Sequence, residues 1–319
     1  MKSLTKNEQS REAIERMVKH CFPGKNMVGY TELTEGYFNV AYEVELDSGE
    51  KVILKVAPAP GTRIMTYERN IMYSEVNAMK AAKSAGLPAP AVLGWDNSRA
   101  ICASPYFFME KLAGKSLNSI KSSLTDGEIG DINRQVGAIN RRINDIRCPR
   151  FGYPGQPEFQ GEQWFPVFRK MLEAGVTDAE NGHVDIKIDV GRLWEMLDRD
   201  CPVFEEIIEP RLVHWDCWDG NIFVEGGKVT GIIDWERSLW ADPLMEVGFR
   251  TYARNEDFFA GYGIWDLTAS QKRRALWYDV YLMVLVSLEC EYRQYETMDM
   301  YEWSTSVLVR QFEKLEGEF

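Results

Sequence analysis

The sequence predicts an α+β protein of two lobes, in which a small antiparallel sheet with one crossing helix precedes a larger, mainly helical part. Two observations lead to this prediction. The 319 residues exceed what one hydrophobic core usually organises, since single cores stop growing at roughly 250–300 residues. Strand and turn signals gather before residue 110, whereas helical periodicity dominates after it. We therefore expect one lobe over residues 1–110 and a second over 111–319.

The first lobe alternates between strand signals and helix signals. Apolar residues recur at helical spacing in two segments, and β-branched or aromatic residues gather in four others. The turn Asp47-Ser48-Gly49 joins two of these strands into a hairpin. The expected elements are a helix over Asn7–His20, strands over Tyr37–Leu46 and Lys51–Val56, a helix over Tyr67–Ala85, and strands over Ala91–Trp95 and Tyr106–Met109.

The second lobe is mainly helical, with one short hairpin. Gly226-Gly227 is a tight turn between two apolar strands, and apolar stripes elsewhere indicate amphipathic helices. The expected elements are a helix carrying Ile132 to Ile146, a helix around Trp164–Leu172, strands over Asn221–Val224 and Val229–Ile233, and helices over Tyr278–Leu288 and Trp303–Phe312.

The composition of the chain indicates the compartment in which the protein is expected and argues against a membrane segment. Met1–Ser10 is polar and lacks a signal-peptide core. The longest apolar run, Val280–Leu288, is about half of the roughly 20 residues that span a bilayer. The six cysteines are scattered without a Cys-x-x-Cys pair, which indicates reduced thiols. We expect a cytoplasmic protein without a membrane segment.

The net charge of −12 is unevenly distributed along the chain. Residues 1–112 carry 14 Lys/Arg and 13 Asp/Glu, a net +1, whereas residues 113–319 carry 23 and 36, a net −13. An acidic surface repels nucleic acid and anionic lipid and attracts cations. We expect no nucleic-acid partner, and any cation-binding surface lies in the second lobe.

The most informative passage runs from His214 to Glu236. It holds the spacing Asp216-x-x-x-x-Asn221 and, after the Gly-Gly hairpin, Asp234 behind two isoleucines. Phosphoryl transfer needs a carboxylate that orients the acceptor hydroxyl and takes its proton. It also needs a carboxylate and an amide oxygen that hold Mg²⁺ on the phosphate oxygens. Singly, each of these residues suits a turn, a cap or a strand end, but together they indicate this chemistry.

The passage resembles the catalytic loop of the aminoglycoside phosphotransferase and choline kinase superfamily, relatives of the protein kinases, whose pattern is His-Gly-Asp-x-x-x-x-Asn. The resemblance implies a bilobal protein-kinase-like fold and an ATP- and Mg²⁺-dependent small-molecule kinase. It implies that Asp216 is the catalytic base and that Asn221 and Asp234 are magnesium ligands. His214 would brace the loop, and Glu236 and Asp242 would be structural or lie behind the metal ligands.

The same resemblance extends through the first lobe. Glu35-Gly36-Tyr37-Phe38-Asn39 resembles the hairpin over the ATP phosphates, with Gly36 and Asn39 as nucleotide contacts. Lys55 matches the strand lysine that reaches the α and β phosphates. Glu75 matches its partner on the crossing helix, with Glu68 as the alternative. Met109, Glu110 and Leu112 match the linker between lobes whose backbone binds adenine.

Three departures from the family pattern bear on the function. Trp215 replaces the usual Gly and crowds the loop, which leaves open a nucleotide-binding module without efficient transfer. Asp234 is followed by Trp-Glu and not by Phe-Gly, which argues against a protein kinase. The helix that ends near Asn144 lacks the His often found there. A pure interaction scaffold would show no thermal shift with ATP.

The acceptor is less well defined by the sequence. Nine of the ten tryptophans lie in the second lobe, and Trp218, Trp235 and Trp240 are close to the catalytic loop. Aromatic faces and carboxylates together bind ammonium groups, although core packing explains tryptophans equally well. The pattern favours an amine-bearing alcohol, such as an aminoglycoside or amino alcohol. We expect residues 162–209 to build the acceptor pocket; the oligomeric state is left open.

Overall fold

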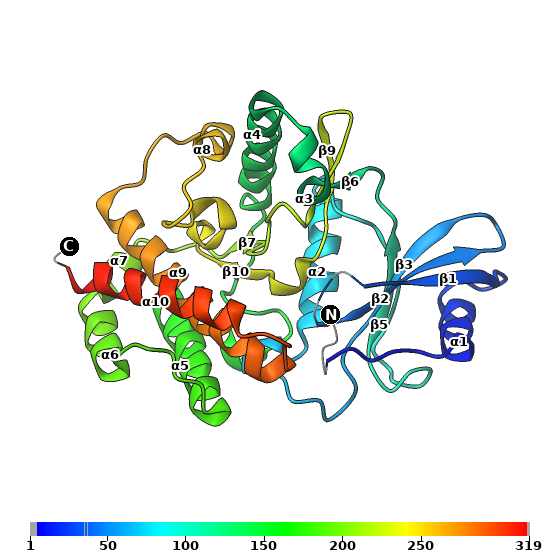
Figure 1. Cartoon of the computed structure of the whole chain (residues 1–319), viewed down its shortest axis with the longest axis horizontal. Coiled ribbons are helices and arrows are strands. Elements are labelled where there is room, and N and C mark those ends of the chain that lie inside the picture. The colour runs from blue at the N-terminus through cyan, green and yellow to red at the C-terminus, as the bar shows by residue number, and fades with distance from the viewer. Residues whose placement is uncertain (1–4, 35, 37, 318–319) are drawn as a thin grey trace.

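The computed structural model describes residues 5–34, 36 and 38–317, and it has two lobes (Figure 1). The smaller N-terminal lobe, the N-lobe, contains a five-stranded antiparallel sheet in the order β1-β2-β3-β5-β4. The larger C-terminal lobe, the C-lobe, is mainly helical. The N-lobe elements are α1 (Arg11–Cys21), β1 (Met27–Leu33), β2 (Val40–Leu46), β3 (Lys51–Val56), α2 (Ile71–Ser84), β4 (Val92–Asp96) and β5 (Tyr106–Glu110).

The C-lobe holds two small sheets among its helices. Strands β7 and β10 form an antiparallel pair, and β6, β8 and β9 form a three-stranded sheet. The strands are β6 (Lys115–Ser116), β7 (Arg211–Val213), β8 (Ile222–Glu225), β9 (Lys228–Ile232) and β10 (Leu239–Ala241). The helices are α3 (Leu117–Ile120), α4 (Asp126–Ile143), α5 (Trp164–Gly182), α6 (Val190–Arg199), α7 (Cys201–Phe204), α8 (Glu256–Tyr262), α9 (Ala269–Arg293) and α10 (Asp299–Glu316).

Strand alternation in β3 decides which side chains face the active-site cleft. Successive side chains of a strand point to opposite faces of its sheet. Val52, Leu54 and Val56 belong to the hydrophobic cluster that includes residues of α1. Ile53 belongs to the cluster that includes residues of α2. Lys55 therefore shares the α2 side of the sheet with Ile53.

Short 3-10 helices connect the main elements at three points that matter for the site. One precedes α2, one follows Asp234, and two lie between β10 and α8. They are η1 (Thr66–Glu68), η4 (Trp235–Arg237), η5 (Pro243–Met245) and η6 (Val247–Phe249).

The segment that leads into α2 is bonded to the C-lobe. Both the backbone N–H and the hydroxyl of Thr66 donate to Asp178 of α5, at 2.6 and 2.8 Å. Arg293 at the end of α9 donates to Glu68 at 2.8 Å. The Gln156 amide donates to the carbonyl oxygens of Tyr67 and Arg69. Figure 1 accordingly places α2 between the sheet and the C-lobe.

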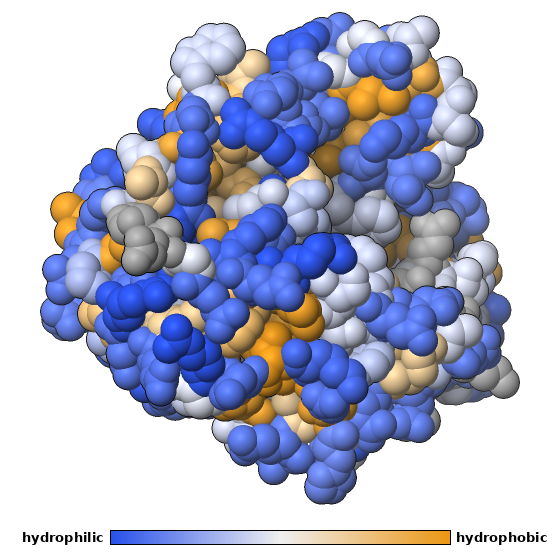
Figure 2. Space-filling model, turned by 60° about the vertical axis from the view of Figure 1, so that its left-hand side comes forward, coloured by the Kyte–Doolittle hydropathy of each residue, from blue (hydrophilic) through white to orange (hydrophobic). Residues whose placement is uncertain are grey.

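The core of the C-lobe is organised around α9. Most of its residues are buried, and they include the charged Arg273, Arg274 and Asp279. Arg273 donates to Asp200, and Arg274 donates to Asp242. Within the described ranges, no helix combines the length and apolar character that crossing a membrane requires. On the face in Figure 2, hydrophilic residues predominate and hydrophobic side chains form separate patches.

Candidate active site

The candidate active site lies where three strands of the C-lobe end. His214 follows β7, Asn221 precedes β8, and Asp234 follows β9. Strands β8 and β9 are antiparallel neighbours. The backbone N–H of Ile233 donates to the carbonyl oxygen of Asn221 at 2.9 Å. This bond fixes the two predicted magnesium ligands on adjacent strands.

His214 braces the loop as a neutral imidazole. It is fully buried. Its Nδ1 accepts the backbone N–H of Asp216 at 3.2 Å, and its Nε2 donates to the carbonyl oxygen of Ile233 at 3.0 Å. Burial lowers the pKa of His214 to about 4, against the opposing effect of Asp234. The ring therefore connects the base of the loop to the end of β9, next to Asp234, the predicted metal ligand.

We expect His214 to make folding stability depend on pH. Because its pKa is about 4 in the fold and ~6.5 in an unfolded chain, the unfolded state gains the proton first as the pH falls. The contribution is fully present above pH ~6.5 and is lost progressively toward pH ~4. The free energy of unfolding of wild type relative to His214→Gln should fall by about 2 kcal/mol from pH ~7 to ~5. Denaturant unfolding at both pH values measures this change, and a constant difference would contradict it.

Trp215 fits into the core in the place of the usual glycine. Its φ is 63°, a left-handed conformation that costs a non-glycine residue roughly 1–2 kcal/mol. The side chain is fully buried and stacks on Tyr281, with ring centroids 5.3 Å apart and planes 10° apart. Burial of an indole offsets such strain. The loop is therefore not crowded by Trp215, and its internal hydrogen bonds are formed.

Glu246 is an important buried residue that the sequence analysis missed. Its carboxylate accepts the backbone N–H groups of His214 and Trp215, at 2.9 and 3.1 Å, and the Asn144 amide at 3.1 Å. Asn144 in turn donates to the carbonyl oxygen of Leu212. Burial raises the pKa of Glu246 to about 7, against these hydrogen bonds. Asn144, which stands where the family often has His, thus helps to hold the catalytic loop.

Asp216 and Asn221 are in direct contact. The Asn221 amide nitrogen donates to the backbone oxygen of Asp216 at 2.8 Å and to its carboxylate at 3.2 Å. Burial raises the pKa of Asp216 to about 6, while Arg237 acts to lower it. A carboxylate with a pKa near 6 is a suitable proton acceptor at neutral pH. The bonds also leave the Asn221 amide oxygen available as a ligand for a hard cation.

Lys55 connects the two lobes through carboxylates. Its ammonium donates to Glu75 at 2.6 Å and to Asp234 at 2.8 Å. The alternative partner Glu68 is bonded to Arg293 instead. Burial disfavours the charge on Lys55, but Asp234 and Glu75 outweigh it and raise its pKa.

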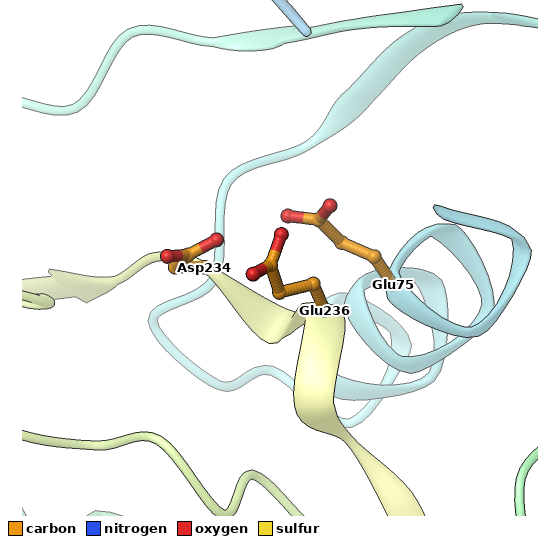
Figure 3. Close-up of side chains that lie close together, drawn as sticks. All are labelled: Glu75, Asp234 and Glu236. Atoms are coloured by element: carbon orange, nitrogen blue, oxygen red, sulfur yellow. The ribbon is translucent and has the colours of Figure 1, made fainter. Parts of the chain in front are cut away.

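Three carboxylates gather in this cluster (Figure 3). Atoms of Glu75, Asp234 and Glu236 lie within 4.8 Å of one another, and in the close-up Glu75 comes from α2 while the other two follow β9. Asn39 of the N-lobe donates to Glu236 at 2.9 Å. Burial and the neighbouring Asp234 raise the pKa of Glu236 well above its usual value. Three carboxylates exceed the charge of one lysine, so added positive charge would stabilise the cluster.

The donor set fits magnesium. Mg²⁺ prefers oxygen ligands and is usually bound through one or two carboxylates together with substrate phosphates. Asp234 gives one oxygen to Lys55 and keeps the other free to bind a cation. The Asn221 amide oxygen is the second candidate ligand. Burial opposes the charge on Asp234, yet Lys55 holds its pKa below the usual value, so it is ionised for such a role.

A cavity of about 520 Å³ opens between the lobes beside these residues. Its volume is within the range of ligand pockets, roughly 300–1,000 Å³. Ile53, Phe223 and Ile233 provide apolar walls. The predicted site residues that line it are Gly36, Asn39, Lys55, Met109, Glu110, Leu112, Asp234 and Glu236. Glu35 and Tyr37 of the predicted hairpin lie outside the described residues.

The linker between the lobes, residues 109–112, places backbone groups at the edge of this cavity. β5 ends at Glu110, whose carboxylate is bonded to Lys83 and to the backbone of Ala91. The backbone N–H of Leu112 has no hydrogen-bond partner within the described part of the chain. The Leu112 side chain packs against Gly231. A larger residue would not fit at position 231, because an added Cβ would lie 2.2 Å from the Leu112 side chain.

Other predicted residues lie away from the cavity. Asp242 caps η5 and accepts hydrogen bonds from Arg274 and Tyr278. Trp235 is buried against His214, whereas Trp218 is 48% exposed.

The charges that act on Asp216 come from outside residues 162–209. Arg237, Glu289 and Arg250 surround it together with Asp234, and Arg237 donates to Glu289 at 2.7 Å. The sequence analysis missed Arg237 and Glu289 because each is only an ordinary charge in its local sequence.

Two lobes, a lysine paired with carboxylates and the loop of Asp216 and Asn221 are the features of the phosphotransferase class that the sequence predicts. Residues 29–276 match the model of the phosphotransferase enzyme family, abbreviated APH. The match spans most of the chain, and the chain therefore belongs to this family. The predicted family is confirmed.

Curated relatives match parts of the chain. A subtelomeric hrmA-associated cluster protein of Aspergillus fumigatus is 30% identical over 122 residues, 38% of this chain and 23% of that protein. Acyl-CoA dehydrogenase family member 10 of Mus musculus is 24% identical over 256 residues, 76% of this chain and 22% of that protein. The chain thus spans less than a quarter of the length of these relatives.

Solved structures of low identity share the fold. A thermostable mutant of aminoglycoside phosphotransferase APH(4)-Ia, in complex with AMP-PNP and hygromycin B, superposes with a TM-score of 0.63 at 18% identity, covering 96% of this chain and 100% of that one. A candidate fructosamine-3-kinase from Thermobifida fusca has a TM-score of 0.66 at 14% identity, covering 95% of this chain and 100% of that one. The predicted bilobal α+β fold is confirmed.

Proposed function

We propose that this protein is a Mg²⁺-dependent kinase that transfers the γ-phosphoryl group of ATP to a hydroxyl of a small, amine-bearing molecule. The observation that carries the proposal is the ion pair of Lys55 and Asp234 in the wall of the cavity between the lobes. Glu75 is bonded to Lys55, and Asn221, which contacts Asp216, accepts the backbone N–H of Ile233 in the same wall. These groups match the needs of phosphoryl transfer, which depends on positioning and on neutralising charge.

The two ends of the cavity suit the two ends of ATP. Apolar side chains and the free backbone N–H of Leu112 suit a purine at the linker between lobes. Lys55 at the inner end suits the phosphates, because a buried ammonium attracts phosphate oxygens strongly. AMP-PNP in the APH(4)-Ia complex is consistent with this assignment.

Asp216 would act as the base. The acceptor oxygen forms the new bond to the γ-phosphorus while the bond to the β-bridging oxygen breaks, and ADP leaves. The hydroxyl proton moves to the Asp216 carboxylate. Asn221 and Asp234 would hold Mg²⁺, whose charge neutralises the phosphate oxygens during transfer. Glu236 is set beside these ligands by its hydrogen bond from Asn39.

The residues around Trp218, where the acceptor would bind, favour a cationic molecule. Trp218 is 48% exposed within the catalytic loop and packs over Gly220, which lines the cavity. Residues 113–319, which include this loop, carry a net charge of −13. An indole face beside carboxylates attracts ammonium groups by roughly 0.5–2 kcal/mol.

The proposal is tested by measuring ADP release with Mg-ATP against aminoglycosides, choline, ethanolamine, sugars and hydroxy amino acids. We expect an amine-bearing alcohol to stimulate release, a phosphate ester to appear by phosphorus NMR, and EDTA to abolish both. A protein that shows no thermal shift with Mg-ATP and no stimulation by any acceptor would overturn the proposal. Stimulation by generic peptides instead would identify a protein kinase.

Trp218→Ala should weaken acceptor binding selectively. We expect the KM of the acceptor to rise about 3- to 30-fold, as loss of a cation–π contact implies, with the KM of ATP unchanged. Trp265→Ala is the matched control, because Trp265 is 84% exposed and lies in another part of the C-lobe. Equal effects of the two variants would show that Trp218 does not contact the acceptor.

A further inference from the structure

A second cavity lies in the N-lobe, outside the proposed transfer site. Its volume is about 260 Å³. It lies between the loop after β3, the segment that begins α2, and the connection from β4 to β5. Phe38 lines both this cavity and the cavity between the lobes. We call it the outer cavity.

The outer cavity carries uncompensated positive charge. Arg69 and Arg99 line it, and neither guanidinium forms a hydrogen bond or ion pair with any residue of the described ranges. The one carboxylate in its wall, Glu68, accepts Arg293 and the backbone N–H of Met65, so it is already satisfied. Arg69 also acts on Asp178 at longer range, but both oxygens of that carboxylate bind Thr66.

Aromatic and proline side chains form part of the remaining wall. Trp95 is half-buried and Tyr73 is 42% exposed, and both line the cavity. Pro58, Pro60 and Pro105 complete the apolar wall. Aromatic and proline faces favour contact with a planar ring. At about 260 Å³, the cavity is below the usual range for ligand pockets, roughly 300–1,000 Å³, and so suits a small molecule.

We propose that the outer cavity is a binding site for a small planar acid, a molecule with an aromatic ring and one phosphate or carboxylate group. The ring would pack between Trp95, Tyr73 and the prolines. The acidic group would pair with Arg69 and Arg99, since guanidinium groups bind carboxylate and phosphate through paired, charge-assisted hydrogen bonds. The site is independent of phosphoryl transfer and does not depend on the proposed function.

Titration calorimetry of the full chain with phenyl phosphate, benzoate and benzylamine tests the site. We expect both acids to bind and benzylamine not to displace them, because its charge has the same sign as the arginines. The two acids distinguish a phosphate ligand from a carboxylate ligand. Arg69→Met/Arg99→Met should weaken binding of the acids at least tenfold, as loss of charge-assisted hydrogen bonds implies.

Arg16→Met/Arg310→Met is the matched control, because it removes two exposed arginines outside the outer cavity. Unchanged affinity in this control is the expected result. Failure of wild type to bind either acid, displacement of the acids by benzylamine, or acid binding that survives in Arg69→Met/Arg99→Met would overturn the proposal. The last outcome would place the acids outside the outer cavity. If the double variant does not fold, the NMR signal of the Trp95 indole in wild type decides the question. This signal is assigned by its absence in Trp95→Phe. A shift on addition of phenyl phosphate supports the proposal, and no shift overturns it.

Discussion

Asp216→Asn is expected to lower kcat by roughly 10²- to 10⁴-fold, the usual contribution of a general base, while leaving ATP affinity unchanged. Asn has nearly the same shape as Asp but cannot take the proton of the acceptor hydroxyl. The hydrogen bond that the backbone N–H of residue 216 donates to His214 does not depend on this side chain. Calorimetry with a non-hydrolysable ATP analogue and a steady-state ADP assay measure the two quantities side by side.

Asp219→Asn is the control within the same loop. Asp219 lies three positions later, and its carboxylate pairs with Lys121 instead of Asn221. We expect this variant to keep kcat within the range of ordinary surface changes. Wild-type turnover in Asp216→Asn would sink the assignment of the base. Loss of both turnover and nucleotide binding would indicate a structural role.

Asp234→Asn is expected to remove the dependence of nucleotide binding on magnesium. The amide keeps the shape of the side chain but loses the charge that faces Lys55 and the proposed metal. Metal stabilisation of phosphoryl transfer contributes several kcal/mol, so kcat should fall by roughly 10²- to 10⁴-fold. Affinity for the ATP analogue is measured with Mg²⁺ and with EDTA. In wild type the two values should differ, and in the variant they should coincide.

Asp131→Asn provides a control for the loss of one negative charge, since Asp131 is 69% exposed on α4. It should retain the difference between Mg²⁺ and EDTA. If Asp234→Asn also retains that difference, the metal is held elsewhere. Glu75 and Glu236 would then be the residues to substitute next, because their carboxylates complete the same cluster.

The elements nearest the chemistry were predicted closely from the sequence. The strand predicted over Lys51–Val56 coincides with β3, because strict alternation of apolar residues marks a half-buried strand. The same alternation places Lys55 on the face opposite Leu54. The hairpin around Gly226-Gly227 was predicted to within one residue at each strand end. Local pattern and turn chemistry determine these segments, so they can be read without knowledge of the fold.

Elements whose stability comes from distant partners were predicted poorly. β1 has a largely exposed burial pattern and contains Gly29, so its sequence lacks a strand signal. The helix predicted over Tyr278–Leu288 is α9, which begins at Ala269 and ends at Arg293. Its first turns contain Arg273 and Arg274, which read as surface residues. Both are buried because they pair with aspartates 73 and 32 positions away.

Glu246 illustrates the same limit within the site. It stands in an otherwise apolar run, Pro243–Phe249, and this was the only local signal of its burial. Its partners are 31, 32 and 102 positions away in the chain. A carboxylate surrounded by apolar residues is costly to bury without hydrogen bonds, so such residues can be examined as candidates for buried supports of a loop.

The attachment of α2 to the C-lobe affects how the cleft can open. Thr66 and Glu68 tie the start of this helix to α5 and α9, whereas Lys55 belongs to the sheet. A rotation of the sheet as one body would therefore leave Glu75 behind and separate the ammonium from its carboxylate. The Lys55–Glu75 contact is thus the link between the sheet and α2, and its formation would report that the two have come together.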